Sequence, residues 1–106
     1  MGNANCGEGF ACDLHALTAA ERLRHRELLQ RLRPSARHIS ELANGYQFHL
    51  NSGDISFREA AEWVDLERRC CPFLAFQLQI AGGQSGIVLE VTGPEGVKLF
   101  IDAELR

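Results

Sequence analysis

The most chemically unusual stretch of the sequence is residues 67–73, Glu-Arg-Arg-Cys-Cys-Pro-Phe, in which two cysteines are adjacent. Neighbouring side chains on a helix point about 100° apart, so the thiols of Cys70 and Cys71 are predicted to point in different directions and to have different roles. A disulfide between adjacent cysteines would be strained, which favours a more distant partner for each thiol. Glu67 and Trp63 lie at helical spacings from the pair and are expected to converge on it. This arrangement would place a proton acceptor beside a thiol.

The charges around these thiols have opposite effects on their ionisation. The C-terminal end of a helix carries partial negative charge and disfavours a thiolate, whereas Arg68 and Arg69 favour one. A bound soft cation would resolve this conflict, because a thiol that coordinates a metal is deprotonated.

Further thiol and imidazole groups occur in the N-terminal part of the sequence. Cys12 and His15 form a Cys-x-x-His pair, and His25 follows on the first predicted helix. Such groups suit zinc, copper(I) or mercury(II). Their spacing matches no strong zinc-finger pattern, so a surface position for His25 and a role as small buried hydrophobes for the cysteines stay open as alternatives.

Two capping boxes, at residues 18–21 and 56–59, predict the starts of the first two helices. The first helix is expected to end near Arg33 and the second before Pro72, because proline disfavours helical geometry in the residue that precedes it. The apolar residues at helical spacing in the second helix are Phe57, Ala60, Ala61, Val64 and Cys71.

Two hairpins and a third helix complete the predicted fold. Asn44-Gly45 between strands 36–42 and 46–50 suits a type I′ turn with positive φ at both residues. Alternating patterns over residues 76–80 and 87–91 predict a second hairpin, and Pro94 starts the last helix. We therefore expect a flexible tail over residues 1–11 and one α+β domain over residues 12–106. Its order is α-β-β-α-β-β-α, with one antiparallel four-stranded sheet and the helices packed on it.

Composition and charge indicate a protein without disulfides, membrane segments or general affinity for nucleic acids. A chain of 106 residues that is 45% hydrophobic can build one core unaided, so the cysteines, Cys6 included, are expected to be reduced thiols. We expect a cytoplasmic protein without a membrane segment. The net charge of −3 argues against a general nucleic-acid binder. Arginines are concentrated in residues 22–37. They are expected to form ion pairs with acidic residues in the rest of the protein, and contact with an anion or a nucleic acid is the alternative.

Two parts of the sequence resemble a group of small bacterial proteins for which no activity is settled. One part is residues 11–14 with Glu21, Arg22 and His25, and the other is residues 67–73 followed by Thr-Gly-Pro-Glu-Gly at 92–96. The resemblance spans residues 11–105 and implies one domain. It also implies that a shared site would contain Cys12, His25, Cys70, Cys71 and Glu67, whereas Cys6 and His15 fall outside the matching parts.

Three functions fit these residues. The first is the binding of a thiophilic metal ion, most simply zinc or else a toxic soft metal, by Cys12, His25, Cys70 and Cys71. The second is a thiol-dependent oxidoreductase or transferase in which Cys70 or Cys71 is the nucleophile and Glu67 accepts a proton. The third is a structural or interaction module with buried cysteines, whose partner would be another protein or a second copy of the chain.

Overall fold

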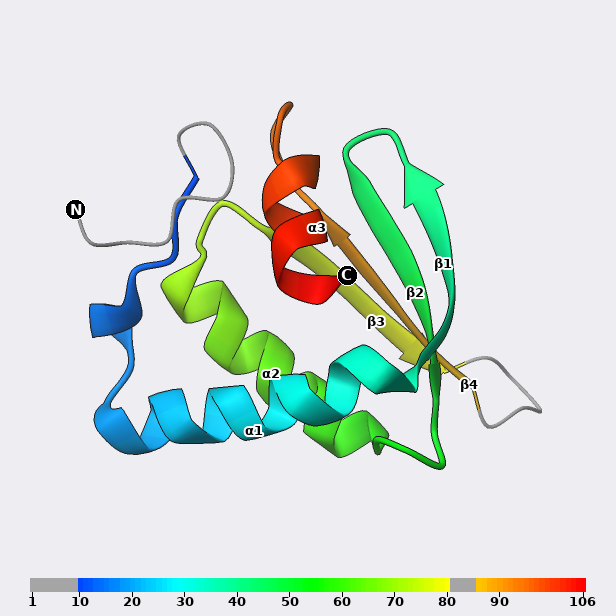
Figure 1. Ribbon diagram of the computed structural model, residues 1–106, viewed down its shortest axis with the longest axis horizontal. Coiled ribbons are helices and arrows are strands. Elements are labelled where there is room, and N and C mark those ends of the chain that lie inside the picture. The colour runs from blue at the N-terminus through cyan, green and yellow to red at the C-terminus, as the bar shows by residue number, and fades with distance from the viewer. Residues whose placement is uncertain (1–9, 81–85) are drawn as a thin grey trace.

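A computed structural model describes residues 10–80 and 86–106 of the chain (Figure 1). The elements follow the predicted order: 3-10 helix η1 (Leu14–Ala16), α1 (Ala19–Ser35), β1 (Ala36–Leu42), β2 (Gly45–Asn51), α2 (Phe57–Cys70), β3 (Ala75–Ile80), β4 (Gly86–Thr92) and α3 (Lys98–Leu105). The prediction of one α+β domain with a four-stranded antiparallel sheet is therefore confirmed. Most of the predicted tail lies outside the described residues.

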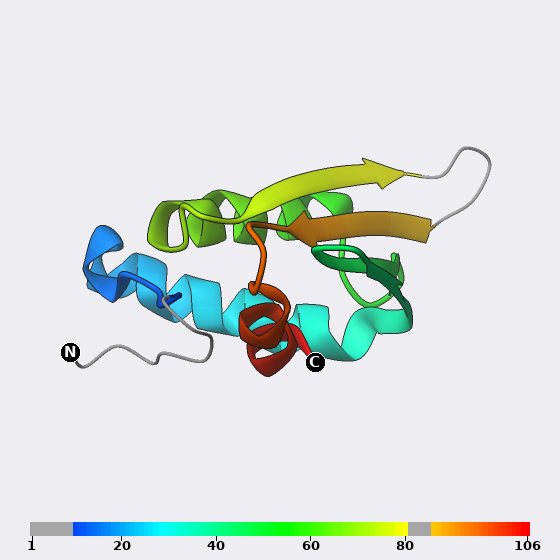
Figure 2. The same cartoon turned by 90° about the horizontal axis from the view of Figure 1, so that it is seen from above.

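The sheet has the strand order β1-β2-β4-β3, and every neighbouring pair is antiparallel. Alternate residues of the two central strands point toward the core and are buried: Tyr46, Phe48, Leu50, Ile87, Leu89 and Val91. The helices cover this face, as Figure 2 shows. The opposite face carries polar side chains such as Gln47, whose Nε2 donates to Glu90 at 2.8 Å. The domain therefore has two layers, with its core between sheet and helices.

Both predicted capping boxes are present, but α1 is longer than expected. Thr18 and Ser56 are the N-caps of α1 and α2, and each exchanges hydrogen bonds with the glutamate three residues later. Helix α1 continues through Pro34 to Ser35. The buried Ser35 hydroxyl donates to the carbonyl of Leu32 at 2.6 Å, which holds the last turn in place.

The apolar residues at helical spacing predict the buried face of α2 only in part. Phe57 is 38% exposed, whereas Trp63, Leu66 and Glu67 are buried together with Ala60 and Cys70. Periodicity of apolar residues alone could not find this face, because a glutamate lies at its centre.

The predicted type I′ turn at Asn44-Gly45 was also wrong. Leu42 pairs with Gly45, which belongs to β2, so Ala43 and Asn44 form the turn. In the described part of the chain the one residue with positive φ is Gly96. Glycine is needed at position 45 for another reason: a Cβ there would lie 2.0 Å from the carbonyl oxygen of Val91 on β4.

The last helix begins later than the sequence indicates. The backbone N–H of Val97 donates to the carbonyl of Pro94 at 3.1 Å, which closes a separate turn, and α3 starts at Lys98. Gly96, with a φ of 92°, lies within that turn and prevents a continuous helix from Pro94. Four apolar residues in and just before α3 are buried and pack it on the core: Val97, Phe100, Ile101 and Leu105.

The arginine-rich segment forms ion pairs with acidic residues elsewhere in the fold. Arg24 donates two hydrogen bonds of 2.9 Å to Glu62, and Arg37 pairs with Asp54 at 2.7 Å. Arg31 pairs with Glu59. These contacts confirm the expectation of ion pairing. Across residues 10–80 and 86–106, the structure has no helix that is both long and apolar enough to cross a membrane.

We expect Gly45→Ala to lower the free energy of unfolding by about 1–3 kcal/mol, because the added methyl group would clash with the β4 backbone. Gly53→Ala is the matched control. A Cβ at Gly53 would meet nothing closer than 3.6 Å, so this variant should be as stable as the wild type or slightly more so. Urea denaturation measures both, and an equal stability of the two variants would contradict the close approach at Gly45.

Candidate metal centre

The N-terminal segment places Cys12 over the C-terminal end of α2. The backbone N–H of Asp13 donates to the carbonyl of Cys70 at 2.7 Å. Two residues before Cys12, the ring of Phe10 packs on that of Phe73, with centroids 4.9 Å apart. A backbone bond and an aromatic contact therefore hold Cys12 from both sides.

Cys70 and Cys71 lie where α2 ends, and both are completely buried. Cys71 is the C-cap of α2, with a non-helical φ of −128° and ψ of 70°, and the next residue is Pro72. This change of backbone direction brings the two sulfur atoms within 3.9 Å of each other. The expectation that the two thiols point in different directions was wrong, because it assumed helical geometry at both residues.

Three overlapping groups of side chains meet at this point. The Sγ atoms of Cys12, Cys70 and Cys71 lie within 4.8 Å of one another, and none of the three is in a disulfide. In two further groups the potential ligand atoms also lie within 4.8 Å of one another. One group is Cys12, Glu67, Cys71 and Glu104, and the other is His25, Glu67 and Cys70. We call these six residues the central cluster.

The central cluster contains the four residues proposed as metal ligands, Cys12, His25, Cys70 and Cys71, and the proposed proton acceptor Glu67. It also contains Glu104, which the sequence analysis missed. Two other candidates are not brought into it: His15 is exposed and belongs to none of the three groups, and Cys6 lies outside the described residues.

His25 on α1 and Glu67 on α2 join the two helices. His25 Nε2 lies 2.6 Å from Glu67 Oε1, and the side chains are 14% and 0% exposed. The ring of Trp63 stacks on His25 with centroids 6.1 Å apart and an angle of 24° between the planes. The predicted approach of Glu67 to the cysteines is therefore confirmed, and Trp63 contacts the site through His25.

Glu104 reaches the cluster from α3. One turn earlier on that helix, Phe100 packs edge-to-face on Phe73 at 5.0 Å, which fixes α3 against the turn that follows Cys71. Glu104 follows the buried residues Phe100 and Ile101 at helical spacing. An acidic residue beside an apolar stripe was the available signal for this position.

The groups of the cluster shift one another's proton affinity. The neighbouring thiols of Cys12 and Cys71 lower the pKa of Cys70 to about 3, and the pKa values of Cys12 and Cys71 are raised correspondingly. Burial raises the pKa of Glu67 to about 7. Burial, followed by the neighbouring Glu67, raises the pKa of Glu104 to about 10. Proton affinity in the metal-free cluster is therefore unequal: it is lowered at Cys70 and raised at the other two thiols and at both carboxyl groups.

The two arginines that were expected to favour a thiolate are paired elsewhere. Arg68 lies 2.9 Å from Asp65, and Arg69 donates two hydrogen bonds of 3.0 Å to Glu21. The lowered pKa of Cys70 therefore originates within the cluster, mainly from the other two thiols.

Two carboxylate oxygens of the cluster, Glu67 Oε2 and Glu104 Oε1, are buried and receive no hydrogen bond from an N–H or hydroxyl group of the described residues, so a proton shared between the two carboxyl groups or a bound ion must satisfy them. A buried polar atom in this state is costly, by about 1–3 kcal/mol, unless something satisfies it. Sulfur, nitrogen and oxygen donors that face one another in a buried space are suited to a metal ion, and thiolates with imidazole suit zinc and softer ions. The central cluster can therefore hold a metal ion.

No family model, no curated protein and no solved structure matches this chain. The resemblance to small bacterial proteins stays a prediction. The geometry and chemistry of the cluster are therefore the basis for assigning a function.

Replacing Glu104 should change how stability depends on pH. Since the folded protein holds the carboxyl pKa near 10 rather than 4.5, the stability that the protonated group contributes is complete below about pH 4.5 and falls as pH rises toward 10. A glutamine amide at this position would imitate the protonated form and would not titrate. The melting temperature of metal-free Glu104→Gln should therefore exceed that of the wild type increasingly from about pH 5 to about pH 8, finally by about 4 °C or more.

Thermal denaturation in the presence of a chelator measures this difference. Glu95→Gln makes the same change of side chain at an exposed position and should show no such trend. A Glu104→Gln difference that is the same at every pH would contradict a protonated Glu104 in the folded protein.

Proposed function

We propose that this protein binds a thiophilic metal ion, most simply zinc or else a toxic soft metal, through the thiolates of Cys12, Cys70 and Cys71. The observation that carries the proposal is the mutual approach of the three Sγ atoms within 4.8 Å. These sulfur atoms come from the N-terminal segment and from the end of α2, and two of the three cysteines are completely buried.

The remaining members of the cluster would complete the coordination. Structural zinc sites have four ligands in a tetrahedron, so three thiolates leave one position for an imidazole or a carboxylate. Glu67 is the best placed residue, because it belongs to both groups that extend the cysteine set. His25 is the alternative through its proximity to Cys70. A softer ion would be satisfied by the three thiolates alone.

A cation also resolves the electrostatics of the site. Glu67 is completely buried and Glu104 is partly buried, and His25 is the only basic side chain in the cluster. Charges of one sign in a poorly solvated space are unfavourable unless a counter-charge is present. A bound metal would keep all three thiols deprotonated and would provide a positive counter-charge for the buried carboxylate of Glu67.

Binding would also stabilise the fold. The metal would join the N-terminal segment to α2, which share the hydrogen bond from Asp13 to Cys70. Because the unfolded chain has no preformed site, the free energy of binding adds to the free energy of unfolding.

A thiol oxidoreductase is the second candidate, and the lowered pKa of Cys70 with Cys12 alongside favours it. In that case the Cys70 thiolate would attack a substrate disulfide, and Cys12 would resolve the mixed disulfide. The complete burial of Cys70 opposes this function, because a substrate disulfide must reach the attacking sulfur. A purely structural module accounts for the buried cysteines but gives no role to the two carboxyl groups that lie among them.

The protein purified without a tag or chelator should contain about one metal ion per chain, as is typical of a closed structural site. Inductively coupled plasma mass spectrometry measures the content, and thiol titration before and after chelation measures protection. Removing the metal should lower the melting temperature, and adding it at about 100 times its dissociation constant should restore about 2.7 kcal/mol of stability.

Variants assign the ligands. Cys12→Ser should weaken metal binding and expose the other two thiols to titration, because Cys12 contributes one of three coordinating sulfur atoms. His25→Ala and His15→Ala form a matched pair, in which only the first replaces a member of the cluster. Protein that contains no metal, gains no stability from zinc, copper(I) or mercury(II) and keeps its thiols freely reactive would refute the proposed function.

Alkylation separates the two candidate functions. In metal-free protein at neutral pH, Cys70 should react with iodoacetamide slowly despite its lowered pKa, because its sulfur is completely buried, and a fast phase that Cys70→Ser removes would favour the thiol enzyme. In metal-loaded protein no thiol should react. A fast phase that persists in the presence of bound metal would favour the thiol enzyme.

A further inference from the structure

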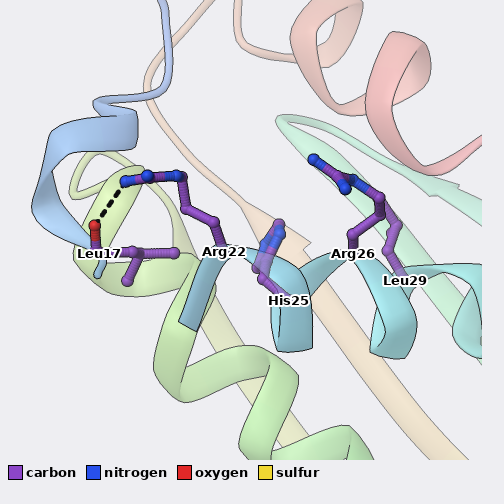
Figure 3. A pocket seen from close by; sticks show the side chains of 5 residues that line it. All are labelled: Leu17, Arg22, His25, Arg26 and Leu29. Atoms are coloured by element: carbon purple, nitrogen blue, oxygen red, sulfur yellow. Dashed lines mark hydrogen bonds between the residues drawn. The ribbon is translucent and has the colours of Figure 1, made fainter. Parts of the chain in front are cut away.

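A pocket of about 200 Å³ opens on α1 next to the central cluster (Figure 3). Its walls are Leu17, Arg22, His25, Arg26 and Leu29. His25 belongs to the pocket and to the cluster, where it lies against Glu67 and Cys70. The pocket is therefore separated from a cluster thiol by a single, partly exposed imidazole.

The pocket is positively charged. Arg22 and Arg26 are one helical turn apart and lie on either side of His25 in Figure 3. Arg22 Nη1 donates to the carbonyl of Leu17 at 2.8 Å, which holds its guanidinium at the pocket wall. Arg26 is exposed and has no ion-pair partner in the part of the chain that the structure describes. Its neighbour Arg24, by contrast, is paired with Glu62.

The other walls are apolar. Leu17 is buried and Leu29 is partly buried, so the pocket combines two guanidinium groups with an aliphatic surface. Guanidinium groups bind carboxylates with well-directed hydrogen bonds. The chemistry of the walls therefore fits a small molecule that has a short aliphatic part and at least one carboxylate.

We propose that this pocket receives a carboxylate-bearing low-molecular-weight thiol, which delivers the metal to the central cluster as its thiolate complex. The inference rests on the proposed metal-binding function and specifies the form in which the metal arrives. Arg26 binds the carboxylate of the carrier. His25 lies between the carrier and Cys70 and is the first member of the cluster that the incoming complex meets.

The transfer is a ligand exchange without any change of oxidation state. At each exchange a bond forms between the metal and a cysteine sulfur, and a bond between the metal and the carrier sulfur breaks. The proton of a cysteine thiol passes to the carrier thiolate that leaves. The cysteines bind the metal one after another, so the metal has a sulfur ligand at every step.

Stopped-flow fluorescence tests the proposal. Trp63 is the only tryptophan in the sequence and stacks on His25, so its emission reports metal arrival. The probes are mercury(II) bound to mercaptosuccinate, which carries carboxylates, and mercury(II) bound to uncharged 2-mercaptoethanol. Arg26→Ala should slow uptake from the mercaptosuccinate complex about tenfold and leave uptake from the mercaptoethanol complex unchanged.

Arg33→Ala is the matched control, because Arg33 is also exposed on α1 but does not line the pocket. It removes the same charge and should affect neither rate. Equal slowing in the two variants, or no effect of Arg26→Ala on either complex, would overturn the carrier pocket while leaving metal binding intact. Failure of the wild type to take up mercury from either complex would overturn the proposed function and the carrier pocket together.

Discussion

A single buried carboxylate, that of Glu67, determines how the parts of this domain meet. It lies at the centre of the core face of α2, where an unpaired carboxylate would be strongly unfavourable. His25 satisfies one of its oxygens at 2.6 Å, which fixes the position of α1 along α2. Its backbone carbonyl accepts from the N–H of Cys71 at 2.8 Å, where α2 ends. One residue thus fixes the contact between two helices and the place where the two adjacent thiols leave α2.

Local patterns in the sequence were enough to predict the order of elements, the two capping boxes and the buried faces of the central strands, because each depends on residues close together in the chain. Helical spacing also predicted that Trp63, Glu67 and Cys70 share one side of α2. Cys12 and His25 were found by residue type and resemblance, since nothing in their spacing shows that α1 and the N-terminal segment meet the end of α2.

Other features depend on contacts that no local pattern contains. Gly45 resembles a turn residue in sequence, yet it is required by the approach of β4 from the other half of the sheet. The directions of the Cys70 and Cys71 thiols follow from the point at which α2 stops, one residue before Cys71. Glu104 joins the cluster only because aromatic packing of Phe100 on Phe73 brings α3 over that point. Each error thus arises where tertiary packing overrides a local preference.

The origin of the cluster in four separate segments has a consequence for biosynthesis. Cys12 precedes all the helices of the described fold, whereas Glu104 lies in the last turn of α3, which a ribosome would make after every other element. Contacts between such distant residues carry a large loop-closure cost and form late in folding. A nascent chain therefore presents the three thiols and Glu67 before Glu104, the second carboxyl group of the cluster, exists. Closure of the cluster is therefore tied to the synthesis and docking of α3, and a chain that lacks α3 has a different set of groups around its three thiols.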